Sequence, residues 1–266
     1  MANELVLTTI NNSVATVTLN NPAKHNAFDD EIIALLTSTF NALASNTDIR
    51  AMVLTGNGKS FSAGGDLAWM KRMADYNYDE NLADAQSLAL MLKTLNALPF
   101  PTIAKVAGTA FGGAVGLISC CDIAIGASNA KFSLSEVKIG LLPATISPYV
   151  IAAIGQRAAR RYFLTAERFD ANAAVQLGLL AECVELDALD GKVGEIINAI
   201  LGNSPVAIKA SKQLIFNVAG KALDQQLIDY TCDEIARIRA SAEGKEGLQA
   251  FLDKRPAHWI KTDGHS

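Results

Sequence analysis

The sequence predicts an α/β fold, in which strands alternate with helices and are followed by a region that is helical throughout. Half of the 266 residues are hydrophobic and 19% are charged, which supplies enough apolar side chains for a sizeable core. Over residues 1–195, short β-like runs alternate with amphipathic stretches, and the runs end in small residues. Beyond residue 195 the strand signals disappear.

The first elements are a hairpin and a helix. Residues 5–19 alternate apolar and polar side chains around Asn-Asn at 11–12, a pattern typical of a β-hairpin with a polar turn. Asn-Asn-Pro at 20–22 ends the second strand. The acids at 29–31 favour a helix start, because carboxylates are stabilised by the positive end of the helix dipole. Its apolar positions are Ile32, Ile33, Leu35, Leu36, Phe40 and Leu43.

Further strands and one long helix follow along the chain. The predicted strands are residues 51–56, 102–108 and 122–127. Helical periodicity runs from 80 to 98 and stops at the prolines of 99–101. Two glycine-rich stretches, 57–67 and 108–117, read as loops that follow strands, and in βαβ units such loops carry function. We therefore predict a core domain over 1–195.

The C-terminal part, residues 196–266, is predicted to be a separate helical region. Pro205 is typical of a helix start, because proline is favoured at the first helical position. The stretch 221–240 repeats apolar residues at helical spacing: Leu223, Leu227, Ile228, Ile235 and Ile238.

Composition argues against several classes of function. The net charge is −4 and no Lys/Arg block is present, so a protein that binds nucleic acid by neutralising phosphates is not expected. No run of 18 apolar residues predicts a membrane span. The N terminus lacks a basic segment followed by an apolar one, so we expect no signal peptide and a cytoplasmic location. The four cysteines lack metal-ligand spacing, and no metal site is predicted.

One apparent nucleotide-binding motif is rejected. Gly58-Lys59-Ser60 follows a predicted strand and looks like the end of a phosphate-binding P-loop. That motif needs a glycine five residues before Gly58, where this chain has Val53. Neither a GxSxG nor an HExxH motif is present, so no common hydrolase signature remains.

The glycine-rich sequences SFSAGGDL (60–67) and GTAFGGAVGL (108–117) carry the strongest chemical signal. Each follows a predicted strand and precedes a predicted helix, although either alone would also serve as a tight connection. Two loops at one sheet edge could aim two backbone amides at one oxygen, which stabilises the charge formed when a carbonyl is enolised. The helix after the second loop would add its positive dipole end.

Five stretches together resemble the enoyl-CoA hydratase/isomerase (crotonase) superfamily, and the resemblance covers almost the whole chain. They are NPAKHNAF (21–28), FSAGGDL (61–67), the stretch 101–125, AKFSLSEVKIGLLP (130–143) and AFLDKRP (250–256). The resemblance implies a spiral of ββα units with a C-terminal helical region that assembles into homotrimers or hexamers. It also implies an acyl-CoA substrate, whose coenzyme A is part of the substrate rather than a separate cofactor.

The resemblance assigns roles to individual residues. The backbone amides of Gly65 and Gly113 would form an oxyanion hole for the thioester oxygen, and small side chains suit both places. The coenzyme A cradle maps to Lys24, Ala27, Ala63, Asp66 and Leu67. Phe251 and Lys254 match positions that reach the nucleotide of coenzyme A from a neighbouring subunit.

The catalytic carboxylates depart from the best-known pattern of the family. Hydratases of that type carry one glutamate three residues after the oxyanion glycine and a second one twenty residues later. The second position is Glu136, whereas the first is Gly116. We expect Glu136 to be catalytic, with a pKa raised by apolar walls, and a water to occupy the space that Gly116 leaves. Enoyl-CoA isomerases of the family work with one glutamate that moves a proton between C2 and C4.

Flanking stretches indicate a branch of the family. WMKRMA (69–74), 135–150 and 157–171 resemble bacterial methylglutaconyl-CoA and isohexenylglutaconyl-CoA hydratases, which act in leucine and acyclic-terpene breakdown. Their substrates carry a second carboxylate, for which Lys71, Arg72 and Lys138 are candidate partners, although each also suits a solvated helix face. We therefore expect an enoyl-CoA hydratase. An isomerase and a non-catalytic acyl-CoA-binding scaffold remain as alternatives.

Overall fold

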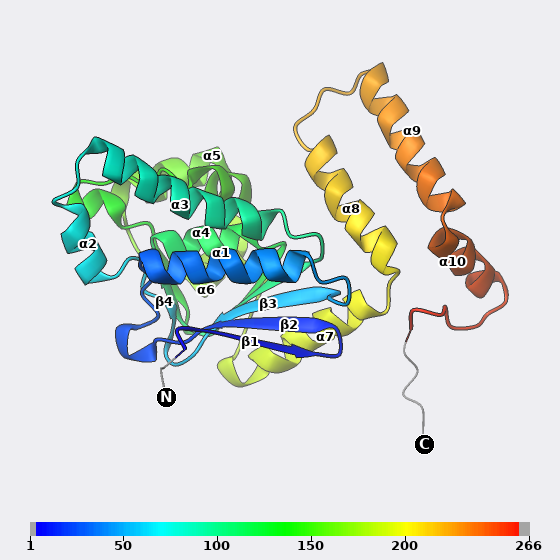
Figure 1. The fold of residues 1–266 in the computed structure, drawn as a ribbon, viewed down its shortest axis with the longest axis horizontal. Helices are drawn as coiled ribbons and strands as arrows, with labels where there is room; N and C mark the ends of the chain where they lie inside the picture. Colours follow the sequence, from blue (N-terminus) through cyan, green and yellow to red (C-terminus); the bar gives the residue numbers. More distant parts are fainter. Residues whose placement is uncertain (1–3, 261–266) are drawn as a thin grey trace.

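The computed structural model describes residues 4–260, which form two β-sheets surrounded by helices (Figure 1). The six-stranded sheet contains, in spatial order, β1 (Val6–Asn11), β2 (Val14–Leu19), β3 (Ala51–Gly56), β5 (Thr102–Val106), β7 (Ile123–Ala127) and β10 (Glu182–Val184). The four-stranded sheet contains β4 (Ser60–Ser62), β6 (Thr109–Phe111), β8 (Lys131–Ser133) and β9 (Phe169–Asp170). Neighbouring strands are parallel except in the pairs β1–β2 and β8–β9.

From β3 to β8, consecutive strands alternate between the two sheets, and this confirms the predicted spiral of ββα units. The pairs β3/β4, β5/β6 and β7/β8 each give one strand to the large sheet and one to the small sheet before the chain turns into helix. The helices are α1 (Asp30–Ala44), α2 (Leu67–Met73), α3 (Tyr78–Asn96), α4 (Gly113–Cys120), α5 (Ser147–Thr165), α6 (Ala171–Leu177), α7 (Leu189–Leu201), α8 (Pro205–Val218), α9 (Gln225–Ala240) and α10 (Ala242–Leu252).

The central strands of the large sheet are buried on both faces, as the strands of parallel sheets usually are. In β3, Met52 and Leu54 belong to the main core cluster, beneath α1, α3 and α4. The alternate residues, Ala51 and Val53, belong to a second cluster that α7 covers from the other side. This two-sided burial explains why β3 begins with a continuous apolar run, residues 51–54.

The predicted hairpin and first helix are confirmed, with a small change at the turn. Asn11 still pairs with Val14, so the two-residue loop is Asn12–Ser13, whose φ angles of 48° and 64° match the left-handed turn that hairpins prefer. Asp29 caps α1 by accepting a hydrogen bond from the Ile32 amide. All predicted apolar positions of α1 are buried except Leu35.

Several short strands were not predicted. The stretch 57–67, expected to be a loop, contains β4, and the stretch 108–117 contains β6. Strands β8, β9 and β10 also lie outside the predicted elements. Each of these strands has two or three residues, too few to show a period of two. Ser60 begins β4 rather than a helix, which agrees with rejecting the P-loop.

The C-terminal helices α8, α9 and α10 extend away from the two-sheet body (Figure 1). No strand follows β10 within residues 4–260, as the sequence predicts. Helix α7 runs across residue 195, and the domain division at that residue stays a prediction. Within the same range no helix is both long and apolar enough to cross a membrane.

A buried lysine attaches α8 to the sheet body. Lys212 Nζ donates to Asp122 Oδ2 at 2.7 Å and to the Phe100 carbonyl at 3.1 Å. We expect Lys212→Met to lower the free energy of unfolding by about 1.5–3 kcal/mol, because Asp122 loses a charged hydrogen-bond partner. Urea denaturation measures this change. Lys209→Met, at an exposed position of the same helix, is the control, and an equal effect of the two substitutions would contradict this role.

Candidate active site

The first glycine loop follows β4 and holds Gly64 in a backbone conformation that favours glycine. Gly64 has a φ of +90°, and an added Cβ would lie 2.8 Å from the Phe111 carbonyl oxygen of the second loop. Its amide donates to Ser62 Oγ at 3.2 Å, and its carbonyl accepts from the Phe28 amide at 2.9 Å. The loop is therefore packed directly against the second loop, with Gly65 at its tip.

The second glycine loop connects β6 to α4. Gly112 has a φ of +53° and donates its amide to the Ser133 carbonyl at 2.9 Å, which ties the loop to β8. Helix α4 begins at the next residue, Gly113, so the Gly113 amide belongs to the first turn and has no partner inside the helix. Among residues 4–260, neither the Gly65 nor the Gly113 amide donates a hydrogen bond.

Glu136 lies beside the second loop. It opens a short 3₁₀ helix (Glu136–Ile139) that follows β8, and its Oε1 lies 3.2 Å from where a Cβ on Gly112 would be. Its other oxygen, Oε2, is buried and has no hydrogen-bond partner in the described part of the chain. Burial raises the pKa of the Glu136 carboxyl, while a hydrogen bond from its own amide opposes this in part. The group is suited to exchange a proton.

Gly116 lies one turn further along α4, and a side chain from another segment occupies the space beside its α-carbon. An added Cβ would lie 2.2 Å from Cγ2 of Ile146, a side chain that is 2% exposed. The expectation of a water in the space left by Gly116 is therefore wrong next to its α-carbon, because Ile146 occupies that space. Of the two positions at which the family resemblance expects a glutamate, 116 and 136, this chain has a carboxylate at Glu136 alone.

The predicted cradle residues of the first loop come together. The segment 24–28 runs beside 63–66, and the Ala63 amide donates to the His25 carbonyl at 2.9 Å. Lys24 Nζ pairs with Asp66 Oδ2 at 2.9 Å, and this hydrogen bond lowers the pKa of Asp66 and raises that of Lys24. Asp66 also caps α2, the helix that begins with Leu67. Ala27 is buried in the same segment.

The other predicted binding residues are dispersed. Phe251 lies near the end of α10, which in Figure 1 is on the opposite side of the chain from α2, and its side chain is 79% exposed. Lys254 follows α10, so neither residue reaches the loops of its own chain. Arg72 forms an ion pair with Asp30. Lys71 and Lys138 form no ion pair with any residue between 4 and 260.

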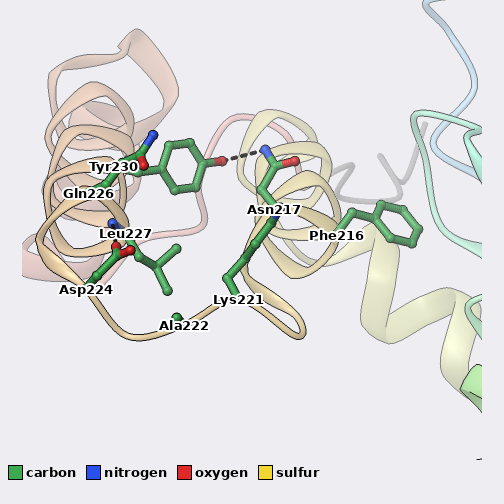
Figure 2. A pocket seen from close by; sticks show the side chains of 8 residues that line it. All are labelled: Phe216, Asn217, Lys221, Ala222, Asp224, Gln226, Leu227 and Tyr230. Carbon is green, nitrogen blue, oxygen red and sulfur yellow. Dashed lines mark hydrogen bonds between the residues drawn. The ribbon is translucent and has the colours of Figure 1, made fainter.

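A cavity of about 410 Å³ lies elsewhere, between α8 and α9 (Figure 2). Asn217 Nδ2 donates to Tyr230 Oη at 2.7 Å across this space. None of the predicted site residues lines it. Within residues 4–260, no group of three His, Cys, Asp or Glu side chains could hold a metal ion.

Sequence reasoning missed two residues at the glycine loops. Phe28 and Ile146 contact Gly113 and Gly116, respectively. Phe28 stands in the NPAKHNAF stretch, yet nothing in the sequence indicates what its ring contacts. Ile146 is far from Gly116 along the chain, and no spacing rule connects the two.

Comparisons with known proteins identify the family of the chain. The family model described as enoyl-CoA hydratase/isomerase matches residues 9–262. The crystal structure of an enoyl-CoA hydratase from Shewanella pealeana is 46% identical, with a TM-score of 0.94 and 97% of both chains covered.

Two curated relatives extend the comparison. A short-chain-enoyl-CoA hydratase of Clostridium acetobutylicum is 30% identical, covering 94% of this chain and 95% of its own. The (E)-benzylidenesuccinyl-CoA hydratase of Thauera aromatica is 33% identical, covering 92% of this chain and 95% of its own. With its two glycine loops and matching fold, the chain belongs to the enoyl-CoA hydratase/isomerase family.

Proposed function

We propose that this protein is an enoyl-CoA hydratase, which adds water across the 2,3-double bond of an acyl-CoA thioester. One observation carries the proposal: within residues 4–260, a buried carboxylate oxygen of Glu136 has no hydrogen-bond partner and lies beside the loop that presents the Gly113 amide, which donates no hydrogen bond there. An unpaired buried carboxylate is costly unless a ligand or a reaction uses it. The names of similar proteins support the same reaction class.

The proposed reaction begins with the thioester oxygen accepting hydrogen bonds from the Gly65 and Gly113 amides. Ionised Glu136 takes a proton from water as the water oxygen bonds to C3. The π electrons of the double bond then move toward the thioester oxygen, giving an enolate that the two amides stabilise. Protonated Glu136 returns the proton to C2 as the carbonyl re-forms, so one water is added in total. Because Ile146 fills the place beside Gly116, one carboxylate serves both steps.

This role predicts a pH dependence. Glu136 acts as a base only when ionised, and burial raises its pKa above the ordinary glutamate range. We expect kcat/KM to fall as the pH drops through this raised pKa, with a limiting slope of one on a logarithmic plot. Initial rates measured over the range in which circular dichroism shows a folded protein check the prediction. A profile that stays flat through this region would contradict Glu136 as the base.

We propose a branched glutaconyl-CoA as the substrate, of the type that occurs in leucine or acyclic-terpene breakdown. Lys71 and Lys138 lie near Gly65 and Glu136 in the sequence and have no ion-pair partner among residues 4–260, so either can meet a second carboxylate. Arg72 is less suited, because Asp30 already pairs with it. The name of the Thauera aromatica relative also implies a carboxylate-bearing acyl group.

A second candidate function is a double-bond isomerase, and the contact between Gly116 and Ile146 favours it, because one carboxylate suffices to move a proton between C2 and C4. Incubation of the protein with short, branched and carboxylate-bearing enoyl-CoAs in ¹⁸O-labelled water separates the candidates. Gain of one labelled water supports the hydratase. Unchanged mass with a displaced double bond supports the isomerase, and no reaction with any substrate supports a non-catalytic binding protein.

We propose a homotrimer or a pair of trimers as the assembly. Helix α9 has no buried residue in a single chain. The helices α8–α10 and the connection between α8 and α9 expose large apolar side chains, including Ile215, Leu223, Ile235, Leu248 and Phe251. A neighbouring copy that covers these side chains would also bring Phe251 and Lys254 to another chain's coenzyme A. Light scattering after size-exclusion chromatography measures the assembly mass.

A further inference from the structure

Phe28 lies between the two glycine loops and contacts both. Its amide donates to the Gly64 carbonyl at 2.9 Å, and its carbonyl accepts from the Asp66 amide at 3.0 Å. These two bonds form a parallel bridge between Phe28 and Gly65. The backbone of Phe28 therefore holds the first loop in place at Gly64 and Asp66, the residues on either side of Gly65.

The side chain of Phe28 reaches the second loop. Its Cζ lies 2.5 Å and its Cε2 lies 3.2 Å from the place where a Cβ on Gly113 would be. The ring is 2% exposed and therefore cannot swing into solvent without opening the core. The far edge of the Phe28 ring thus contacts the first turn of α4 at Gly113, the residue whose amide is the second donor of the proposed oxyanion hole.

Trp69 and Asn26 restrain the position of Phe28. The Trp69 ring lies 6.5 Å from the Phe28 ring, between centroids, and also contacts Gly65. Trp69 Nε1 donates to Asp84 Oδ1 on α3 at 3.0 Å, which fixes the indole. Asn26, two residues before Phe28, is 1% exposed, and its side-chain amide donates to the carbonyls of Asn57 and Ser60.

We infer that Phe28 is a positioning residue that sets the separation between the Gly65 and Gly113 amides. The inference rests on the proposed function, because it concerns the oxyanion hole of that reaction. Two donors stabilise one oxyanion only when both lie at hydrogen-bond distance from it, and an error of about 1 Å costs about 10²-fold in rate. A shorter side chain at residue 28 would let the start of α4 shift while the backbone bridge to Gly65 stays.

Phe28→Leu and Phe28→Met test this role, with Phe40→Leu as the matched control. Leucine ends short of Gly113, whereas methionine extends about as far as the ring but is flexible. Phe40 is also fully buried and lies on α1, and no atom of it is among the three nearest to an added Cβ on any glycine of the two loops. We expect Phe28→Leu to lower kcat about 10²-fold with little change in KM, and Phe28→Met to lower kcat by less. Phe40→Leu should cost stability and leave kcat unchanged.

A second measurement does not need turnover. Acetoacetyl-CoA can lose a proton to give an enolate with its own near-ultraviolet absorbance, and an aligned oxyanion hole favours this ion when the thioester binds. We expect the wild-type protein and Phe40→Leu to give the enolate signal, and both Phe28 variants to weaken it while acetoacetyl-CoA still binds.

The inference is overturned if either folded Phe28 variant keeps the wild-type enolate signal, or if Phe28→Leu and Phe40→Leu reduce kcat equally. Failure of the proposed function has a different signature. In that case the wild-type protein hydrates no enoyl-CoA, and the enolate signal still decides whether Phe28 aligns the two amides. If Phe28→Leu does not fold, the comparison of Phe28→Met with the wild type decides.

Discussion

Glu136→Gln is expected to lower kcat by about 10³-fold, the largest effect of any substitution proposed for this protein. Glutamine keeps the size of the side chain and the contact with the Gly112 loop, but it cannot take a proton from water or return one to C2. Binding of the thioester should be nearly unchanged, because the Gly65 and Gly113 amides remain. Steady-state kinetics gives the first quantity, and calorimetric titration with an acyl-CoA product gives the second.

The matched control is Glu195→Gln, a substitution of an exposed glutamate on α7. Its pair with Lys192 lies at the surface and contributes little, so turnover and stability should stay near the wild type. If Glu136→Gln retained wild-type turnover, Glu136 could be neither the base nor the proton donor. The proposed one-carboxylate mechanism would then be wrong.

Gly113→Ala is expected to lower kcat/KM by about 10²–10³-fold, comparable to the loss of one oxyanion-hole donor. The added methyl group would lie 2.5 Å from Phe28 Cζ, and the buried ring cannot retreat. The start of α4 must therefore move, and the Gly113 amide moves with it. Enoyl-CoA hydration rates under subsaturating conditions measure the loss directly.

Gly194→Ala provides the comparison for this substitution. Gly194 lies inside α7, and no atom lies within 4 Å of its added methyl group. Alanine there should leave activity unchanged and raise stability by about 0.5–1 kcal/mol, the usual difference between the two residues in a helix. If both alanine variants were equally active, close packing at Gly113 would have no role in the site.

Much of the fold follows from local rules that the sequence displays. Residues 51–56 form a strand because the apolar run at 51–54 fits the centre of a sheet that is buried on both faces. Helix α1 starts where Asp29 can cap it, and α8 starts at Pro205. The two glycine loops and Glu136 were also predicted in the sequence, because their residue types and spacing resemble those of the family.

The three-residue strands could not be predicted in this way. Strand β4 is stabilised by pairing with β6, and β8 by pairing with β6 and β9, which come from distant parts of the chain. Each is too short for a local pattern, so its conformation depends on the neighbour that the spiral supplies. The glycine loops depend on these strands, since β4 and β6 lead directly into them.

The sequence by itself determined the fold class and the order of the long elements, because these depend on local propensity and spacing, and its resemblance to the family supplied the candidate residues for the chemistry. The tertiary structure alone decided what surrounds those residues. It places Ile146 against Gly116 and Phe28 between Gly64 and Gly113. Such contacts join residues far apart in the chain, and close packing in the core, rather than any local pattern, determines which side chain fills each space.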